Sequence, residues 1–154
     1  METWKIRKSL NPDELPKGFV YPEKFNKLLF SLDNFGGEIN HGIEPWTIIT
    51  YEDMNSIFSI KFGLSLVQFA QCWKEEMVAF FVVGTGPDPV VMVFDPWALK
   101  RVTETKWIET GKLLEQFPNF EAWLAWVRNS ELAKEFLEDW IHENPDRVLP
   151  EKKH

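Results

Sequence analysis

Apolar side chains recur every three or four residues in two stretches of the chain, and this spacing predicts two helices. The first begins at Pro22, since proline suits the first helical position, and the Gly36-Gly37 pair ends it. The second covers residues 51–63, with two acidic residues near its N-terminus and Gly63 as its C-cap. The residues expected on the buried faces are Phe25, Leu28, Leu29 and Leu32 in the first helix and Met54, Ile57, Phe58 and Phe62 in the second.

Short apolar runs before and after the second helix predict strands, because they are rich in β-branched and aromatic residues and too short for helices. WTIIT, at residues 46–50, precedes the second helix. Three runs follow it: LSLVQFAQCW at 64–73, MVAFFVV at 77–83 and VVMVF at 90–94. The polar alternation of residues 101–108 predicts one more strand, at an edge of the sheet.

A last helix is predicted from Asn119, whose side chain can cap the helix N-terminus. The apolar pattern continues to Ile141, with a kink or a break into two helices at Asn129-Ser130, and Pro145 ends it. We therefore expect a long C-terminal helix. Its apolar positions are Phe120, Trp123, Leu124, Val127, Ala133, Phe136, Leu137, Trp140 and Ile141.

The order of these elements predicts an α+β fold in a single domain. Strands joined by short links form a mainly antiparallel sheet, and the helices before and after them cover at least one of its faces. No repeat, low-complexity tract or linker divides the 154 residues. The single domain is expected to span residues 1–154, with a core at about 15–143 and a tail at 144–154.

The GTGPDP stretch, at residues 84–89, raises the question of a phosphate-binding loop. Such a loop needs backbone N–H groups, a helix N-terminus and usually a lysine. Pro87 and Pro89 have no N–H, a strand follows, and the nearest downstream lysine is Lys100. The stretch is therefore predicted to be a six-residue β-hairpin loop, and not a nucleotide site.

Composition adds a candidate partner class. The chain has eight tryptophans and thirteen phenylalanines, so its core should be rich in aromatic rings, with some left for a binding surface. Its net charge of −7 argues against nucleic acid as a partner and favours a basic protein. No apolar run approaches the length of a membrane helix, and the first residues lack the apolar core of a signal peptide. With one cysteine, Cys72, no internal disulfide can form, and we expect a cytoplasmic protein.

Catalytic and metal-binding candidates are few. His41 lies in a loop without a second histidine at metal-ligand spacing, and no zinc motif occurs. The acidic pairs, Glu52-Asp53 and Glu75-Glu76, are adjacent in the chain, so their side chains diverge. We expect no cofactor, no metal and no enzymatic activity. A small hydrolase that uses His41 or Cys72 remains the less favoured alternative.

Tryptophans near the ends of the predicted strands have acidic residues beside them. Aromatic rings among carboxylates suit a surface that binds a basic protein, whereas the simpler interpretation is that the rings cover the ends of the core. The predicted partner-binding residues are Trp73, Glu75, Glu76, Asp88 and Trp97.

Four motifs follow one another along residues 15–130: PEKFNKLLFSLDNFGG, WTIITYEDM, LVQFAQCW, and PVVMVFDP followed later by NFEAWLAWV. In this order they resemble the SUKH superfamily of bacterial immunity proteins, which includes the yeast Smi and Knr cell-wall regulators. The stretch KEEMVAFFVV departs from the family pattern because its turn has no glycine, and residues 130–143 have no counterpart.

The resemblance implies an α+β protein without catalytic activity. Many members of the superfamily lie beside toxin genes and bind the catalytic domain of the toxin, often a nuclease. For this chain it implies an immunity protein that neutralises a cognate toxin domain, or alternatively a regulatory scaffold of the Smi and Knr type. An acidic inhibitor would be steered toward a basic toxin by long-range attraction.

Overall fold

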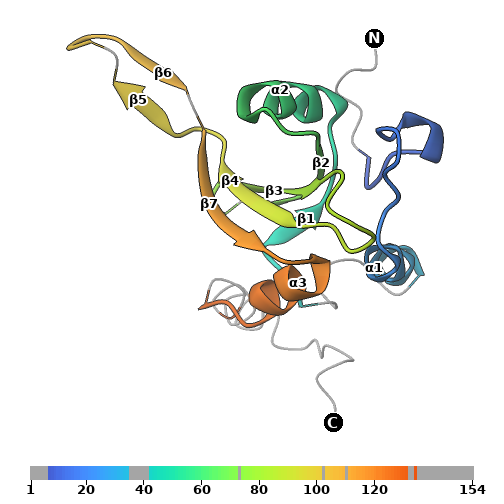
Figure 1. Ribbon diagram of the computed structural model, residues 1–154. Helices are drawn as coiled ribbons and strands as arrows, with labels where there is room; N and C mark the ends of the chain where they lie inside the picture. The colour runs from blue at the N-terminus through green and yellow to red at the C-terminus, as the bar shows by residue number, and fades with distance from the viewer. Residues whose placement is uncertain are drawn as a thin grey trace.

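The computed structural model describes residues 7–34, 42–72, 74–101, 103–109, 111–131 and 134, and Figure 1 shows their arrangement. A single 3-10 turn, Pro12–Glu14, precedes the first helix. The helices are α1 (Glu23–Asn34), α2 (Glu52–Phe62) and α3 (Phe120–Arg128). The strands are β1 (Trp46–Ile48), β2 (Leu66–Cys72), β3 (Met77–Val82), β4 (Val91–Asp95), β5 (Leu99–Arg101), β6 (Trp107–Glu109) and β7 (Lys112–Phe117).

Five strands form one antiparallel sheet in the order β1-β2-β3-β4-β7, which confirms the predicted α+β fold and its meander. The other two, β5 and β6, pair with each other in a separate ribbon that extends away from the sheet (Figure 1). The central strands β2 and β3 are almost wholly buried, because helices cover both faces of the sheet. Burial on both faces explains why these strands read as continuous apolar runs.

Two hydrophobic clusters lie on opposite faces of the sheet. The larger packs α1 and α3 against one face, and it contains Phe25, Phe69, Phe81, Phe120 and Trp123. The smaller lies under α2 and is built on four rings that contact one another. The rings of this second cluster are Phe58, Phe62, Phe80 and Phe94.

The first two predicted helices are confirmed, with one correction. In α1, Phe25, Leu28 and Leu32 are buried as expected, while the Gly36-Gly37 stop lies outside the described residues. In α2, Phe58 is buried, and Gly63 ends the helix in the left-handed conformation at φ +67°.

The correction concerns Ile57, which was predicted to be buried but is 55% exposed. Successive helical residues are about 100° apart, so burying Phe58 and Phe62 turns Ile57 away from the sheet. The side chain of Met54, the remaining residue of that predicted stripe, lies outside the description.

The GTGPDP stretch lies in a hairpin loop between β3 and β4, as predicted, but this loop covers residues 83–90 and is two residues longer than expected. Gly84 and Gly86 have φ values of +89° and +113°, which residues with a side chain rarely adopt. The Thr85 hydroxyl closes the loop: it donates to the Val82 carbonyl at 2.7 Å and accepts from the Val90 N–H at 2.9 Å.

The prediction of a single strand at residues 101–108 is wrong. This segment contains the end of β5, a turn and the start of β6, so it forms the tip of the ribbon. The main sheet has β1 at one edge and β7 at the other, and the pattern did not predict β7 because its side chains are exposed on both faces. Leu114 has no partner in β4, since Glu115 lies opposite Val93 and Leu113 opposite Phe94. Such a bulge protects an edge strand from pairing with another chain.

The C-terminal helix begins as predicted but is short. Asn119 caps α3, since its Oδ1 accepts from the Ala122 N–H at 2.9 Å. The helix ends after nine residues, at Arg128, which corrects the expected long helix. The side chains of Asn129 and Ser130 donate to carbonyls of the last turn, and such bonds favour a helix end. Most of the predicted continuation, residues 133–141, lies outside the described residues.

Of the helices described, none combines the length and the apolar character needed to cross a bilayer.

Candidate partner-binding sites

Two of the predicted partner-binding residues lie in the tight turn between β2 and β3. Glu75 and Glu76 are exposed there, and Glu76 has the left-handed φ of +52°. The turn is short because Cys72 and Met77 are directly opposite each other in the two strands. The adjacent Trp73 lies outside the described residues, so its predicted role stays a prediction.

Trp97 lies at the same end of the sheet as this turn. It follows β4, whose Phe94 is opposite Val78 near the start of β3. The Trp97 side chain is 53% exposed, and its backbone N–H donates to the Asp95 carboxylate at 2.9 Å. The structure therefore brings Glu75, Glu76 and Trp97 to one end of the sheet, and we call these three residues the sheet-end surface.

Asp88 lies at the opposite end of the sheet, in the loop between β3 and β4. The six residues of β3 separate it from the sheet-end surface by about 20 Å at 3.3 Å per residue. Asp88 is instead near α1: the pKa of Lys24 is raised first by its hydrogen bond to Glu121, and Asp88 adds to the effect. The predicted partner-binding residues therefore do not form one compact surface.

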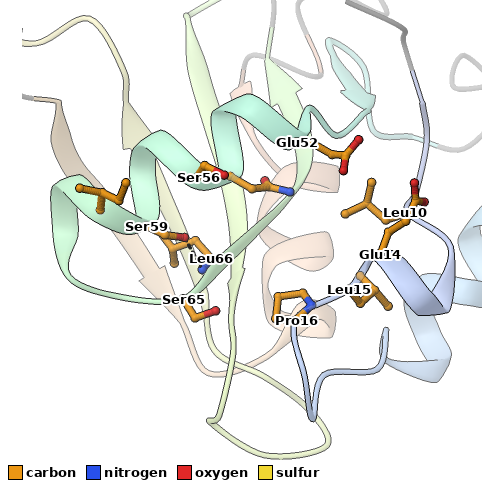
Figure 2. Close-up of a pocket in the computed structure, with 11 residues that line it drawn as sticks. Leu10, Glu14, Leu15, Pro16, Glu52, Ser56, Ser59, Ser65 and Leu66 are labelled. Carbon is orange, nitrogen blue, oxygen red and sulfur yellow. Dashed lines mark hydrogen bonds between the residues drawn. The ribbon is translucent and has the colours of Figure 1, made fainter. Parts of the chain in front are cut away.

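A hollow that the sequence did not reveal lies between α2 and the N-terminal segment 10–16, and we call it the α2 groove (Figure 2). Its volume is about 430 Å³, and Ser65 and Leu66 at the start of β2 complete it. In Figure 2, Glu14 and Glu52 gather at one end of the groove. No motif signals this site, because its walls come from segments about 40 residues apart.

The guanidinium of Arg7 lies beside the two carboxylates at the acidic end of the α2 groove. The Arg7 guanidinium donates to both carboxylate oxygens of Glu14, with the Nη1–Oε2 distance at 2.8 Å. Its Nη1 is 3.9 Å from the nearest oxygen of Glu52. The Arg7 hydrogen bonds, followed by the bond from the Asn11 N–H, lower the pKa of Glu14 to about 2. Two carboxylates thus share one arginine, which is committed mainly to Glu14.

This ion pair predicts a pH dependence of stability. The pKa of Glu14 is lower in the folded chain than its ordinary 4.5, so the ionised carboxylate stabilises the fold above pH 4.5. That contribution is lost as the pH falls from about 4.5 toward 2. We expect Glu14→Gln to be less stable than the native chain at pH 7, with the difference closing over this range. Urea unfolding across the range checks it, with exposed Glu23→Gln as the control; a constant difference would contradict the pairing.

The position of Cys72 does not suit a nucleophile, because a substrate could not reach its thiol. Its side chain is buried in the larger hydrophobic cluster, and burial is the main cause of the raised pKa of its thiol. A raised pKa disfavours the reactive thiolate. His41, the proposed alternative or partner for Cys72, lies outside the described residues.

A second hollow, of about 560 Å³, lies between α1 and α3. It is lined by Lys24, Lys27 and Arg128 among smaller residues. The Lys24 ammonium is paired with Glu121 across the hollow at 2.9 Å, so part of this positive charge is already neutralised. Burial lowers the pKa of Arg128, and the nearby Glu44 opposes that shift.

Among the described residues, no three histidine, cysteine or acidic side chains come together as metal ligands. Comparisons of the chain with models of protein families, with curated proteins and with solved structures found no match.

Proposed function

We propose that this chain is a cytoplasmic immunity protein of the SUKH type, which binds a basic toxin domain and neutralises it without catalysis. The proposal starts from the ordered motifs that resemble the superfamily. The net charge of −7 adds a reason for a basic target, since opposite charges steer two proteins together. A nuclease is one class of toxin with the required basic surface.

The observation that carries the proposal is Trp97, which is 53% exposed at the same end of the sheet as the exposed Glu75 and Glu76. A tryptophan that buries its ring in a partner is among the side chains that contribute most to an interface. Carboxylates around such a ring favour a basic partner over an acidic one. The sheet-end surface thus combines an apolar anchor with a charge that selects the partner.

The test is co-expression with the C-terminal domain of whichever large secreted protein is encoded nearest upstream of this chain. We expect a stable, salt-sensitive complex and protection of the cells from that domain. A complex without protection would favour the alternative, a regulatory scaffold. No complex and no protection would overturn the immunity proposal.

Charge reversal then tests the sheet-end surface. We expect the double change Glu75→Lys and Glu76→Lys to slow association about tenfold or more at low salt, because it replaces two attractive charges with repulsive ones. Asp88→Lys, at the opposite end of the sheet, is the control for the single change Glu75→Lys, which alters the net charge by the same amount, and it should have a much smaller effect. Stopped-flow measurement of association at two salt concentrations decides it; equal effects at both ends would contradict a localised surface.

A further inference from the structure

One face of α2 lines the α2 groove with side chains that do not fill it. Glu52, Asn55, Ser56, Ser59 and Ile60 follow the helical spacing that places residues on one face, and all five line the groove. Among the described residues, the hydroxyls of Ser56 and Ser59 make no hydrogen bond to the N-terminal segment. The Ser59 Oγ accepts from the Leu66 N–H at 2.9 Å.

The groove also offers uncharged polar groups to a ligand, the hydroxyls of its serines. Within the part of the chain that the structure describes, the hydroxyls of Ser56 and Ser65 make no hydrogen bond. In Figure 2, Ser56 lies on α2, and Ser65 lies before β2, toward Pro16. A ligand in the groove can therefore bring polar groups of its own to these hydroxyls.

The far end of the groove is apolar and open. Ile60 is 83% exposed, and Ile57, one turn before it, is 55% exposed. Leu15 and Pro16 lie on the opposite wall. Burial of an aliphatic side chain against apolar groups is favourable relative to leaving it in water. A partner that covers Ile60 would therefore gain from a large aliphatic side chain of its own.

The near end of the groove has a carboxylate available to a cation. The Glu52 side chain is 64% exposed, and its Oε1 is 3.9 Å from Arg7 Nη1. Two hydrogen bonds hold the Arg7 guanidinium on Glu14 instead. Glu52 is the first residue of α2, and ionised carboxylates are favoured at helix N-termini. A second cation could thus pair with Glu52 without displacing Arg7 from Glu14.

We infer that the α2 groove binds an extended segment of another protein, with a cationic side chain on Glu52 and a large aliphatic side chain on Ile60. Eight helical residues separate these two positions, which is about 12 Å at 1.5 Å per residue. Four residues of an extended chain span about 13 Å, and an even spacing places both side chains on the same side. The groove therefore selects a cationic residue followed four positions later by an aliphatic one. This inference goes beyond the proposed function and holds whether or not the partner is a toxin.

The probe is the peptide acetyl-Arg-Thr-Ser-Thr-Leu-amide, titrated into the ¹⁵N-labelled chain and followed by NMR. We expect the amide signals that move to come from residues 55–60, 65–66, 14 and 15. Two control peptides share its length: one has Glu in place of Arg, and the other has the last two residues exchanged. Both should bind at least about tenfold more weakly, a difference of 1.4 kcal/mol.

Variants of the chain complete the test. Glu52→Lys and Ile60→Ala should each weaken the peptide about tenfold or more, and Glu52→Gln serves if the lysine variant does not fold. The matched control is Glu23→Lys, since Glu23 is likewise the exposed first residue of a helix, α1. No signal change at millimolar peptide, signals that move elsewhere, or equal binding of the Glu peptide would overturn the inference.

Discussion

Replacing Trp123 with alanine should lower the free energy of unfolding by about 3–5 kcal/mol, the range measured when a large aromatic side chain is removed from a core. Trp123 is fully buried on α3. Its ring contacts Trp46 of β1, Phe69 of β2 and Phe120 of α3, with centroids 4.8–5.6 Å apart. The alanine variant would leave a cavity at the point where α3 meets the sheet.

Trp97→Ala is the matched control, because the same substitution at a half-exposed ring should change the free energy of unfolding by no more than about 0.5 kcal/mol. Trp123→Phe should cost less than the alanine change, since most of the ring contacts can be kept. Urea unfolding of the three variants provides the measurement. Equal losses for Trp123→Ala and Trp97→Ala would contradict the placement of α3 on the sheet.

The elements that could be predicted from sequence are those whose periodicity or turn chemistry is local. The start of α3 was predictable because Asn119 supplies a cap directly before an apolar stripe. The hairpin loop was predictable because Gly84, Gly86 and two prolines permit little else. Both depend on a few neighbouring residues, so tertiary contacts do not alter them.

The elements that were missed depend on distant parts of the chain. The exposure of Ile57 follows from which face of α2 meets the sheet. Isoleucines lie along one side of this helix and phenylalanines along the neighbouring side, and the helical period alone does not tell which side is buried. The strand β7 has no buried face of its own, so it leaves no alternating pattern. Its place in the sheet comes from hydrogen bonds to β4.

The separation of Asp88 from the sheet-end surface could have been predicted. Each turn of a meander reverses the chain, so the β2–β3 turn and the β3–β4 loop must lie at opposite ends of the sheet. The α2 groove could not, since it requires knowing that residues 10–16 pack beside α2. The sequence carries only a weak sign of the groove: Ser56 and Ser59 lie on a face of α2 where a packed helix would carry larger side chains.

The architecture limits where a partner can bind. Helices cover both faces of the central strands β2 and β3, so these faces are not available. The bulge at Leu114 and the charges of Lys112 and Glu115 disfavour pairing along β7. The ends of the strands and the groove beside α2 are two regions that stay open, and these hold the half-exposed Trp97 and the exposed Ile60. Two proposed contact regions on one small chain follow from this arrangement.

Replacing Gln68 with glutamate should destabilise the fold in a way that depends on pH. Gln68 is completely buried on β2, where its Oε1 accepts from the Tyr51 N–H at 3.1 Å. Its own backbone N–H donates to Asn55 Oδ1 at 2.7 Å. The Gln68 Nε2 has no hydrogen-bond partner among the described residues, so the side chain is only partly satisfied. A carboxylate of the same shape would carry an unpaired charge into this site.

The sign of the pH dependence is opposite to that of Glu14. Burial raises the pKa of an introduced carboxyl group in the folded chain above its unfolded value of about 4.3. Below pH 4.3 both states are protonated, and the variant should be close to the native chain. As the pH rises, the unfolded chain ionises first and stability is lost. If the folded pKa is 7 or above, the loss at pH 7 is about 3–4 kcal/mol.

Two controls separate the charge from other effects. Gln68→Met keeps the size but loses the bond from Tyr51, so it should cost about 1–3 kcal/mol at every pH. Gln116→Glu makes the same chemical change at an exposed position of β7 and should have little effect. Urea unfolding of the three variants at pH 4, 5.5 and 7 gives the comparison. A pH-independent loss for Gln68→Glu would contradict the burial of this side chain between α2 and the sheet, because a hydrated carboxylate has no reason to resist ionisation.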